Sequence, residues 1–120
     1  MIDLRKHFVT VKSDFKEGRV IVIRQSFNIE KRVKKATLYS TALGIYEGRI
    51  NGVKVGKQVF APGYTYYPYR LLYEENSMES LLKEGENELI ITLNGGWYCG
   101  RYTFDNKTQI YGEKEAVSFI

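Results

Sequence analysis

The sequence predicts an all-β, antiparallel sandwich with at most one short helical turn. Several short stretches alternate apolar and polar residues with a period of two, turn residues recur about every ten residues, and only one short stretch favours a helix. With 120 residues, of which 43% are hydrophobic, the chain is long enough for one domain with its own core. We expect about six to eight strands.

The first clear strand pattern covers residues 20–29. It opens with four consecutive apolar residues and then alternates as far as Ile29, and most of its apolar residues are β-branched, which favours a strand. Residues 36–42 alternate in the same way, and residues 44–50 follow at once. These stretches predict two further strands.

The dipeptide Asn51-Gly52 predicts a tight hairpin turn. It stands between the apolar residues Ile50 and Val53, and both of its residues tolerate a positive φ. We therefore expect the strand that ends at Ile50 to turn back into a short strand over residues 53–55.

Residues 60–73 predict an irregular loop, because Pro62 and Pro68 exclude a regular helix and a central strand. We expect residues 71–75 to resume as a strand. The aromatic residues of this loop are Phe60, Tyr64, Tyr66, Tyr67, Tyr69 and Tyr73.

The second half predicts one helical turn and two strands. Residues 77–85 favour the helical turn, with Ser77 as its cap and Gly85 at its end. Residues 87–93 predict a buried strand, and residues 115–120 a final one that is still apolar at the last residue. We therefore expect the chain to belong to a larger protein, and a final strand left exposed near Phe119 to allow an edge-to-edge dimer.

The chain divides into an N-terminal extension with a first strand region, residues 1–19, and a single sandwich, residues 20–120. Residues 1–35 hold ten Lys and Arg against four Asp and Glu, a net charge of +6, whereas residues 36–120 hold eight against ten, a net charge of −2. The densest basic stretch, residues 31–35, is either a solvated turn or a patch for nucleic acid or anionic lipid.

Several functions are excluded by composition. Cys99 is the one cysteine, so an internal disulfide is impossible, and no Cys/His cluster suggests zinc. No apolar run reaches the length of a membrane span, and no charged-then-apolar leader opens the chain. We expect no membrane partner. The location is cytoplasmic or secreted, and the missing leader and disulfide favour the cytoplasm.

Five blocks of residues form a recognisable series: 42–47 (ALGIYE), 50–56 (INGVKVG), 61–67 (APGYTYY, followed by Arg70 and Tyr73), 81–87 (LLKEGEN) and 96–100 (GWYCG). In their order and approximate spacing, these blocks resemble the N-terminal β-sandwich domain of bacterial α-L-rhamnosidases. An Asn-Gly hairpin followed by a Gly-Glu-Asn strand entry also occurs in the sugar-binding jelly rolls of β-galactosidase-like enzymes.

This resemblance implies a jelly-roll, galactose-binding-like sandwich that helps to recognise substrate for a glycoside hydrolase. The catalytic carboxylates of those enzymes lie in a helical toroid, so we expect no catalytic residue in this chain, with rhamnose-containing glycans and the catalytic domain as its partners. Some rhamnosidases carry a sandwich that binds rhamnose through calcium. Tyr64, Tyr66 and Lys57-Gln58 stand where relatives carry Trp or acidic residues, so oxygen ligands are lost and we expect no metal or cofactor.

The candidate ligand-binding residues are aromatic, with one arginine. Sugars are bound by an aromatic ring against a C–H face and by planar polar groups at the hydroxyl rim, and glycines beside Trp97 would let a ligand approach. The alternative roles are structural: Trp97 caps the core, the tyrosines pack on a catalytic domain or on the sandwich itself, and Arg70 pairs with Glu47, Glu74 or Glu75. The candidates are Trp97, Tyr98, Tyr64, Tyr66, Tyr67 and Arg70.

The leading hypothesis is a non-catalytic accessory domain that binds or supports a site for rhamnose-containing glycans. One alternative is a purely structural domain that docks on the catalytic toroid. Another is a nucleic-acid-binding β-domain, which requires the basic residues of 24–35 to share a face with the tyrosines of 64–73. Hydrolysis by the chain itself would need two carboxylates that flank one bond, and no pair is identified.

Overall fold

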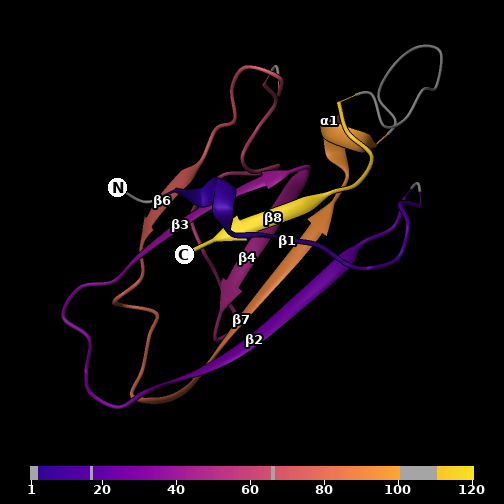
Figure 1. Ribbon diagram of the computed structural model, residues 1–120. Coiled ribbons are helices and arrows are strands. Elements are labelled where there is room, and N and C mark those ends of the chain that lie inside the picture. Colours follow the sequence, from indigo (N-terminus) through magenta and orange to yellow (C-terminus); the bar gives the residue numbers. More distant parts are fainter. Residues whose placement is uncertain (1–2, 17, 66, 101–110) are drawn as a thin grey trace.

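Two antiparallel sheets form the body of the protein (Figure 1). The computed structural model describes residues 3–16, 18–65, 67–100 and 111–120. Within these residues each sheet has four strands, in the orders β1-β8-β3-β6 and β2-β7-β4-β5, and every pairing is antiparallel. The predicted all-β antiparallel sandwich is confirmed.

The β2-β7-β4-β5 sheet contains the longest strands. β2 (Ile21–Ile29) pairs with β7 (Gly85–Asn94) along its whole length, β7 also pairs with β4 (Ile45–Ile50), and β4 pairs with β5 (Val53–Lys54). The predicted hairpin between β4 and β5 is confirmed, because Asn51 and Gly52 both have positive φ, 50° and 84°.

The other sheet consists of β1 (Phe8–Val9), β8 (Ala116–Phe119), β3 (Thr37–Leu43) and β6 (Glu74–Ser77). β8 lies between β1 and β3, so the expectation of an exposed final strand near Phe119 is wrong. The N-terminal strand β1 covers the edge that sequence patterns left open. The edge-to-edge dimer predicted there loses its structural basis.

The core lies between the two sheets and is mostly aliphatic. Ile91 and Leu93 of β7 are 1% and 0% exposed, and full burial of such a side chain contributes about 2–3 kcal/mol. The side chain of Tyr46 crosses the interior. Its hydroxyl lies 2.6 Å from Ser40 Oγ and donates to Glu74 Oε2 at 2.7 Å. Burial raises the pKa of Tyr46, so this phenol stays protonated. The buried cluster also includes Ile21, Ala42, Ile50, Val55, Ala61, Met78, Leu89 and Val117.

The helical segments differ from expectation. Residues 77–85 contain a hydrogen-bonded turn rather than a helix, since Ser77 ends β6 and only the Met78 carbonyl accepts two following amides, from Leu81 and Leu82. The short helices are instead η1 (Leu4–Lys6) and α1 (Gly96–Cys99). Pairing with β3 also moves the strand predicted at residues 71–75 to β6, Glu74–Ser77.

The two ends of the sandwich have different chemistry (Figure 1). β2 leads into the basic stretch at the end where β7 begins, since Ile29 pairs with Gly85, whereas α1 follows Asn94 at the other end of β7. Ten residues of strand span about 30 Å. The nucleic-acid hypothesis required basic residues and tyrosines on one face, and this geometry does not meet that requirement.

No helix within the described residues has the length and apolar character needed to cross a membrane.

Candidate functional site

A cleft of about 330 Å³ opens at the end of the sandwich where β7 leads into α1. The aromatic rings of Phe15, Phe60 and Trp97 form its walls. Backbone atoms form much of its floor, because glycines lie at both ends of α1. The segment before β2 forms the remaining wall. The lining residues are Phe15, Gly18, Arg19, Ile45, Phe60, Asn94, Gly95, Gly96, Trp97 and Gly100.

Trp97 is half-buried and holds the loop of residues 60–73 against α1. Its ring meets Phe60 edge to face, with centroids 6.2 Å apart and planes at 81°, and meets Tyr64 in the same way at 5.9 Å and 78°. Such pairs contribute about 0.5–1.5 kcal/mol each beyond their buried area. Trp97 is therefore compatible with both the core-packing and the ligand-binding interpretation, since it packs on the protein and also lines the cleft.

The aromatic cluster continues away from the cleft. The ring of Tyr67 lies 5.1 Å from Tyr98 and 5.1 Å from Tyr111, and the hydroxyls of Tyr64 and Tyr111 are 2.7 Å apart. Burial raises the pKa of Tyr98. The structure thus brings the predicted residues Trp97, Tyr98, Tyr64 and Tyr67 into one cluster. Tyr66, also predicted, lies outside the described residues.

Arg70 stands apart from this cluster. It is exposed and does not line the cleft, and none of the ion pairs among the described residues includes it. Two of its three expected partners are engaged elsewhere: Glu47 accepts a bond from Arg49 at 2.6 Å, and Glu74 accepts the Tyr46 hydroxyl. The predicted salt bridge of Arg70 with a nearby glutamate is therefore wrong.

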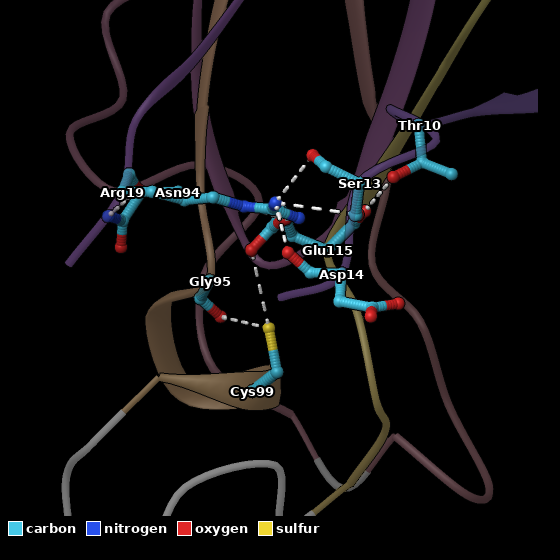
Figure 2. A network of polar contacts seen from close by, with 8 residues as sticks. All are labelled: Thr10, Ser13, Asp14, Arg19, Asn94, Gly95, Cys99 and Glu115. Atoms are coloured by element: carbon cyan, nitrogen blue, oxygen red, sulfur yellow. Dashed lines mark hydrogen bonds and ion pairs between the residues drawn. The ribbon is translucent and has the colours of Figure 1, made fainter. Parts of the chain in front are cut away.

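One residue of the cleft lining, Arg19, forms an ion pair with the buried side chain of Glu115 (Figure 2). Arg19 donates from Nε to Glu115 Oε1 at 2.9 Å and also from Nη2, and the Glu115 side chain is fully buried. Arg19 Nη1 donates to Asp14 O at 2.6 Å and to Ser13 Oγ at 3.1 Å. The pair thus fixes residues 13–19 against the start of β8.

This arrangement also sets one wall of the cleft. The Arg19 guanidinium lies 5.9 Å from the centroid of the Phe15 ring, and both residues line the cleft. Removing one partner of a buried pair leaves an uncompensated charge, which costs about 3–5 kcal/mol. Sequence patterns missed this pair because its members are 96 residues apart and Arg19 lies in the segment assigned to the N-terminal extension.

Cys99, the last residue of α1, is fully buried, as a small apolar group would be. Its Sγ lies 3.7 Å from Glu115 Oε2 and 3.9 Å from the carbonyl oxygen of Gly95 (Figure 2). Burial, together with the Glu115 carboxylate, raises the pKa of the thiol to about 12. The thiol is therefore neutral and unreactive near neutral pH.

The glycines around Trp97 are explained by the packing of the chain on itself. A Cβ on Gly96, whose φ is +50°, would lie 2.8 Å from Ile45 Cγ2, and one on Gly100 would lie 2.4 Å from the carbonyl oxygen of Gly96. Asn94 fixes the same turn, since its Oδ1 accepts from Gly96 N at 3.0 Å and its Nδ2 donates to Arg19 O at 3.0 Å. These contacts hold α1 rigidly beside the cleft.

Among the described residues that line it, the cleft contains aromatic surface and a guanidinium but no carboxylate. Within the described part of the chain, no group of three or more His, Cys, Asp or Glu side chains is placed to hold a metal ion. Calcium takes six to eight oxygen ligands and usually several carboxylates. The lining of the cleft does not fit such an ion.

Comparison with known proteins identifies the family. The model of the α-L-rhamnosidase N-terminal domain matches residues 31–120. This chain belongs to that family. An α-L-rhamnosidase from Streptomyces avermitilis is 38% identical over 96 residues, which is 79% of this chain and 9% of the relative. The α-L-rhamnosidase N-terminal domain described here therefore spans about a tenth of the length of that relative.

Solved structures agree with this assignment. The native α-L-rhamnosidase from Aspergillus terreus superposes with a TM-score of 0.86 at 36% identity, over 93% of this domain and 13% of that chain. The Streptomyces avermitilis α-L-rhamnosidase complexed with L-rhamnose gives a TM-score of 0.77 at 36% identity, over 82% of this domain and 10% of that chain. The resemblance seen in the sequence is confirmed.

Proposed function

We propose that this chain is a non-catalytic recognition domain of an α-L-rhamnosidase, and that the cleft beside Trp97 binds a sugar ring of a rhamnose-containing glycan. The observation that carries the proposal is the cleft itself, with three aromatic walls, Phe15, Phe60 and Trp97, beside the partly buried guanidinium of Arg19. A relative that is 36% identical was crystallised with L-rhamnose, which supports this class of ligand.

The cleft suits one sugar ring. Its volume of about 330 Å³ lies at the lower end of small-molecule sites. The aromatic walls supply apolar surface for the C–H faces of the ring, and the indole N–H of Trp97 and the guanidinium of Arg19 supply polar groups for its rim. The ion pair of Arg19 with Glu115 keeps Phe15 and α1 in place, so little ordering is required when the sugar binds.

The arrangement of carboxylates supports a non-catalytic role. Glycoside hydrolysis uses two carboxyl groups about 5–9 Å apart around one bond. The part of the lining that the structure describes contains no carboxyl group, Glu47 is paired with Arg49, and Glu74 is bound to Tyr46 inside the sandwich. Hydrolysis is therefore assigned to another part of the parent enzyme, and binding here is proposed to be independent of calcium.

Calorimetric titration of the chain with L-rhamnose and a rhamnosyl disaccharide, with calcium and with a chelator, tests this proposal. We expect saturable binding in both conditions, weakened about tenfold or more by Trp97→Ala, since a central aromatic anchor contributes 2 kcal/mol or more. Tyr69→Ala is the matched control, because Tyr69 is an 87% exposed aromatic residue of the same loop and does not line the cleft. Flat heats at millimolar sugar, or an unchanged affinity of Trp97→Ala, would contradict the proposal.

A second candidate function, docking on the catalytic domain, is favoured by the exposed apolar surface of the loop. Val59, Tyr69 and Tyr73 are 67%, 87% and 60% exposed. Exposed apolar residues grouped on one loop are typical of an interface. Docking predicts that Tyr69→Ser and Tyr73→Ser weaken association with a separately produced catalytic region while Trp97→Ala does not. Equal association of all three variants would remove this candidate.

A further inference from the structure

We propose that a groove on the outer face of the β1-β8-β3-β6 sheet is a second carbohydrate site, which takes two or more adjacent units of a neutral oligosaccharide. The choice of a glycan as ligand rests on the proposed function, whereas the site is separate from the Trp97 cleft and shares no lining residue with it. The groove has a volume of about 770 Å³. Its lining residues are Leu4, Arg5, Phe8, Tyr39, Thr41, Leu71, Tyr73 and Glu75.

Strand alternation places the floor of this groove on the outer face. Ser40 and Glu74 point inward, where both contact the Tyr46 hydroxyl. Their neighbours Tyr39 and Glu75, which pair directly across β3 and β6, therefore point outward. The outer face thus combines an aromatic ring with a carboxylate at adjacent positions.

Two hydroxyl groups at the centre of the sheet fasten the walls of the groove. Thr41 and Ser118 pair directly across β3 and β8, and both side chains point outward. The Thr41 hydroxyl donates to the carbonyl of Leu72 in the aromatic loop, and the Ser118 hydroxyl donates to the carbonyl of Leu4 in η1. The loop and η1 are thereby held on either side of the floor, so the groove is a constructed feature of the fold.

The polar groups in the groove are available to a ligand. Within the described part of the chain, no hydrogen bond or ion pair engages the side chains of Tyr39, Tyr73 or Glu75. Arg5 at the rim is already bound to Asp3, through Nε at 2.9 Å and Nη2 at 3.2 Å, so it does not neutralise Glu75. A carboxylate without a cationic partner disfavours anionic ligands and accepts hydroxyl donors.

These features match a neutral sugar chain. Phe8, Tyr39 and Tyr73 supply rings for the C–H faces, and Glu75 with the two phenols can bind neighbouring hydroxyls of a diol. The groove is more than twice the volume of the cleft, about 770 Å³ against about 330 Å³, which favours several linked units over one ring. We expect the groove to bind oligosaccharides more tightly than monosaccharides.

Titration followed by amide NMR tests the proposal, because each site reports through its own residues. The probes are L-rhamnose, a rhamnosyl disaccharide and a rhamnosyl trisaccharide. We expect shift changes near Tyr39 and Glu75 that saturate at lower concentration as the probe lengthens. Glu75→Gln and Tyr39→Phe keep the shape of the groove, and each should weaken these shifts about tenfold, while the shifts around Trp97 keep their midpoint.

The control and the outcomes separate the two proposals. Glu86→Gln makes the same change of charge on an exposed residue of β7 and should leave both sets of shifts unchanged. Shifts at the cleft alone would overturn the groove proposal and support the proposed function. Shifts at the groove alone would support the groove proposal and overturn sugar binding at the cleft. Groove shifts that appear only with the catalytic region, and with no sugar, would show a protein interface and overturn the groove proposal. Equal midpoints for Glu75→Gln and the unaltered chain would also overturn it.

Discussion

The two ends of the sandwich are held together by opposite kinds of chemistry. At the α1 end a buried ion pair, Arg19 with Glu115, ties the segment before β2 to β8. At the other end two neutral side-chain amides connect the turns. Asn51 Nδ2 donates to Asn87 Oδ1 at 2.9 Å, and Asn87 also bonds to the backbone N–H and C=O of Lys83. Both polar sites are deep, since Glu115 and Asn87 are 0% and 1% exposed.

The difference shows where the fold accepts a costly interaction. A neutral amide network satisfies backbone groups of the turns and adds stability without charge. A buried ion pair gains little over apolar packing, because both ions lose their hydration. The ion pair occurs at the end that carries the cleft, where it orders Phe15 and α1. Stability is thus concentrated at the amide end and positioning at the ionic end.

Loss of one ion-pair partner should have the largest effect. Arg19→Met leaves the Glu115 carboxylate buried without a partner, so we expect the free energy of unfolding in urea to fall by about 3–5 kcal/mol. The exposed pair of Arg24 with Glu88 provides the control, and Arg24→Met should cost less than about 1 kcal/mol. The double variant Arg19→Met, Glu115→Leu should regain much of the loss. Equal effects of the two single variants would show that the buried pair has no special role.

Breaking the amide end should cost less and leave the cleft intact. Asn87→Ala removes four hydrogen bonds to backbone or Asn51, so we expect a loss of about 2–3 kcal/mol of unfolding free energy. The amide NMR signals of α1 should keep their positions, because α1 lies at the far end of β7. Asn28→Ala, on an exposed residue of β2, is the matched control. Displaced α1 signals in Asn87→Ala would contradict the independence of the two ends.

One glycine at each end allows a comparison of steric effects. Gly96 and Gly85 both have positive φ, +50° and +89°, so alanine is strained at either position by about 1 kcal/mol. At Gly96 the new Cβ would also lie 2.8 Å from Ile45, whereas at Gly85 nothing lies within 4 Å. We expect Gly96→Ala to lose about 1–2 kcal/mol more than Gly85→Ala in thermal or urea unfolding. An equal loss would mean that α1 can shift away from β4.

The smallest effect is a dependence on alkaline pH that belongs to the α1 end. The pKa of Cys99 is raised from 9.0 to about 12 in the folded chain, so the folded state holds this proton more tightly than the unfolded state. The stability from this proton is complete below pH 9 and is lost as the pH rises from 9 towards 12, by about 1 kcal/mol at pH 10. Urea unfolding of the unaltered chain and of Cys99→Ala should therefore converge as pH rises. Parallel curves would exclude this linkage.

Local patterns predicted the fold well and the supports of the site poorly. The alternation in residues 20–29 and the Asn51-Gly52 turn are local signals, and β2 and the β4–β5 hairpin are found there. The position of β8 between β1 and β3 depends on pairing between residues more than 100 apart, such as Phe8 with Ser118, and no local pattern carries that information.

The candidate site shows the same division. Trp97, Tyr98, Tyr64 and Tyr67 were predicted from residue type and lie in one cluster, and their role in binding stays a prediction. The Arg19–Glu115 pair and the outer groove emerge only from sheet topology, because their members are scattered along the chain. A single arginine such as Arg70 gives no sequence signal that separates a site residue from a solvated one.

The position of β2 gives the basic N-terminal third a physical role. Among the strands that the structure describes, β2 is an outer one of nine residues, and half of its peptide groups face no neighbouring strand. Long exposed edges of this kind pair with strands of other molecules and promote aggregation, unless like charges keep the two molecules apart. The basic residues 31–35 follow β2 directly and place like charges at one end of this edge. Like charges of this kind disfavour the pairing of two copies along the most exposed side of the sheet.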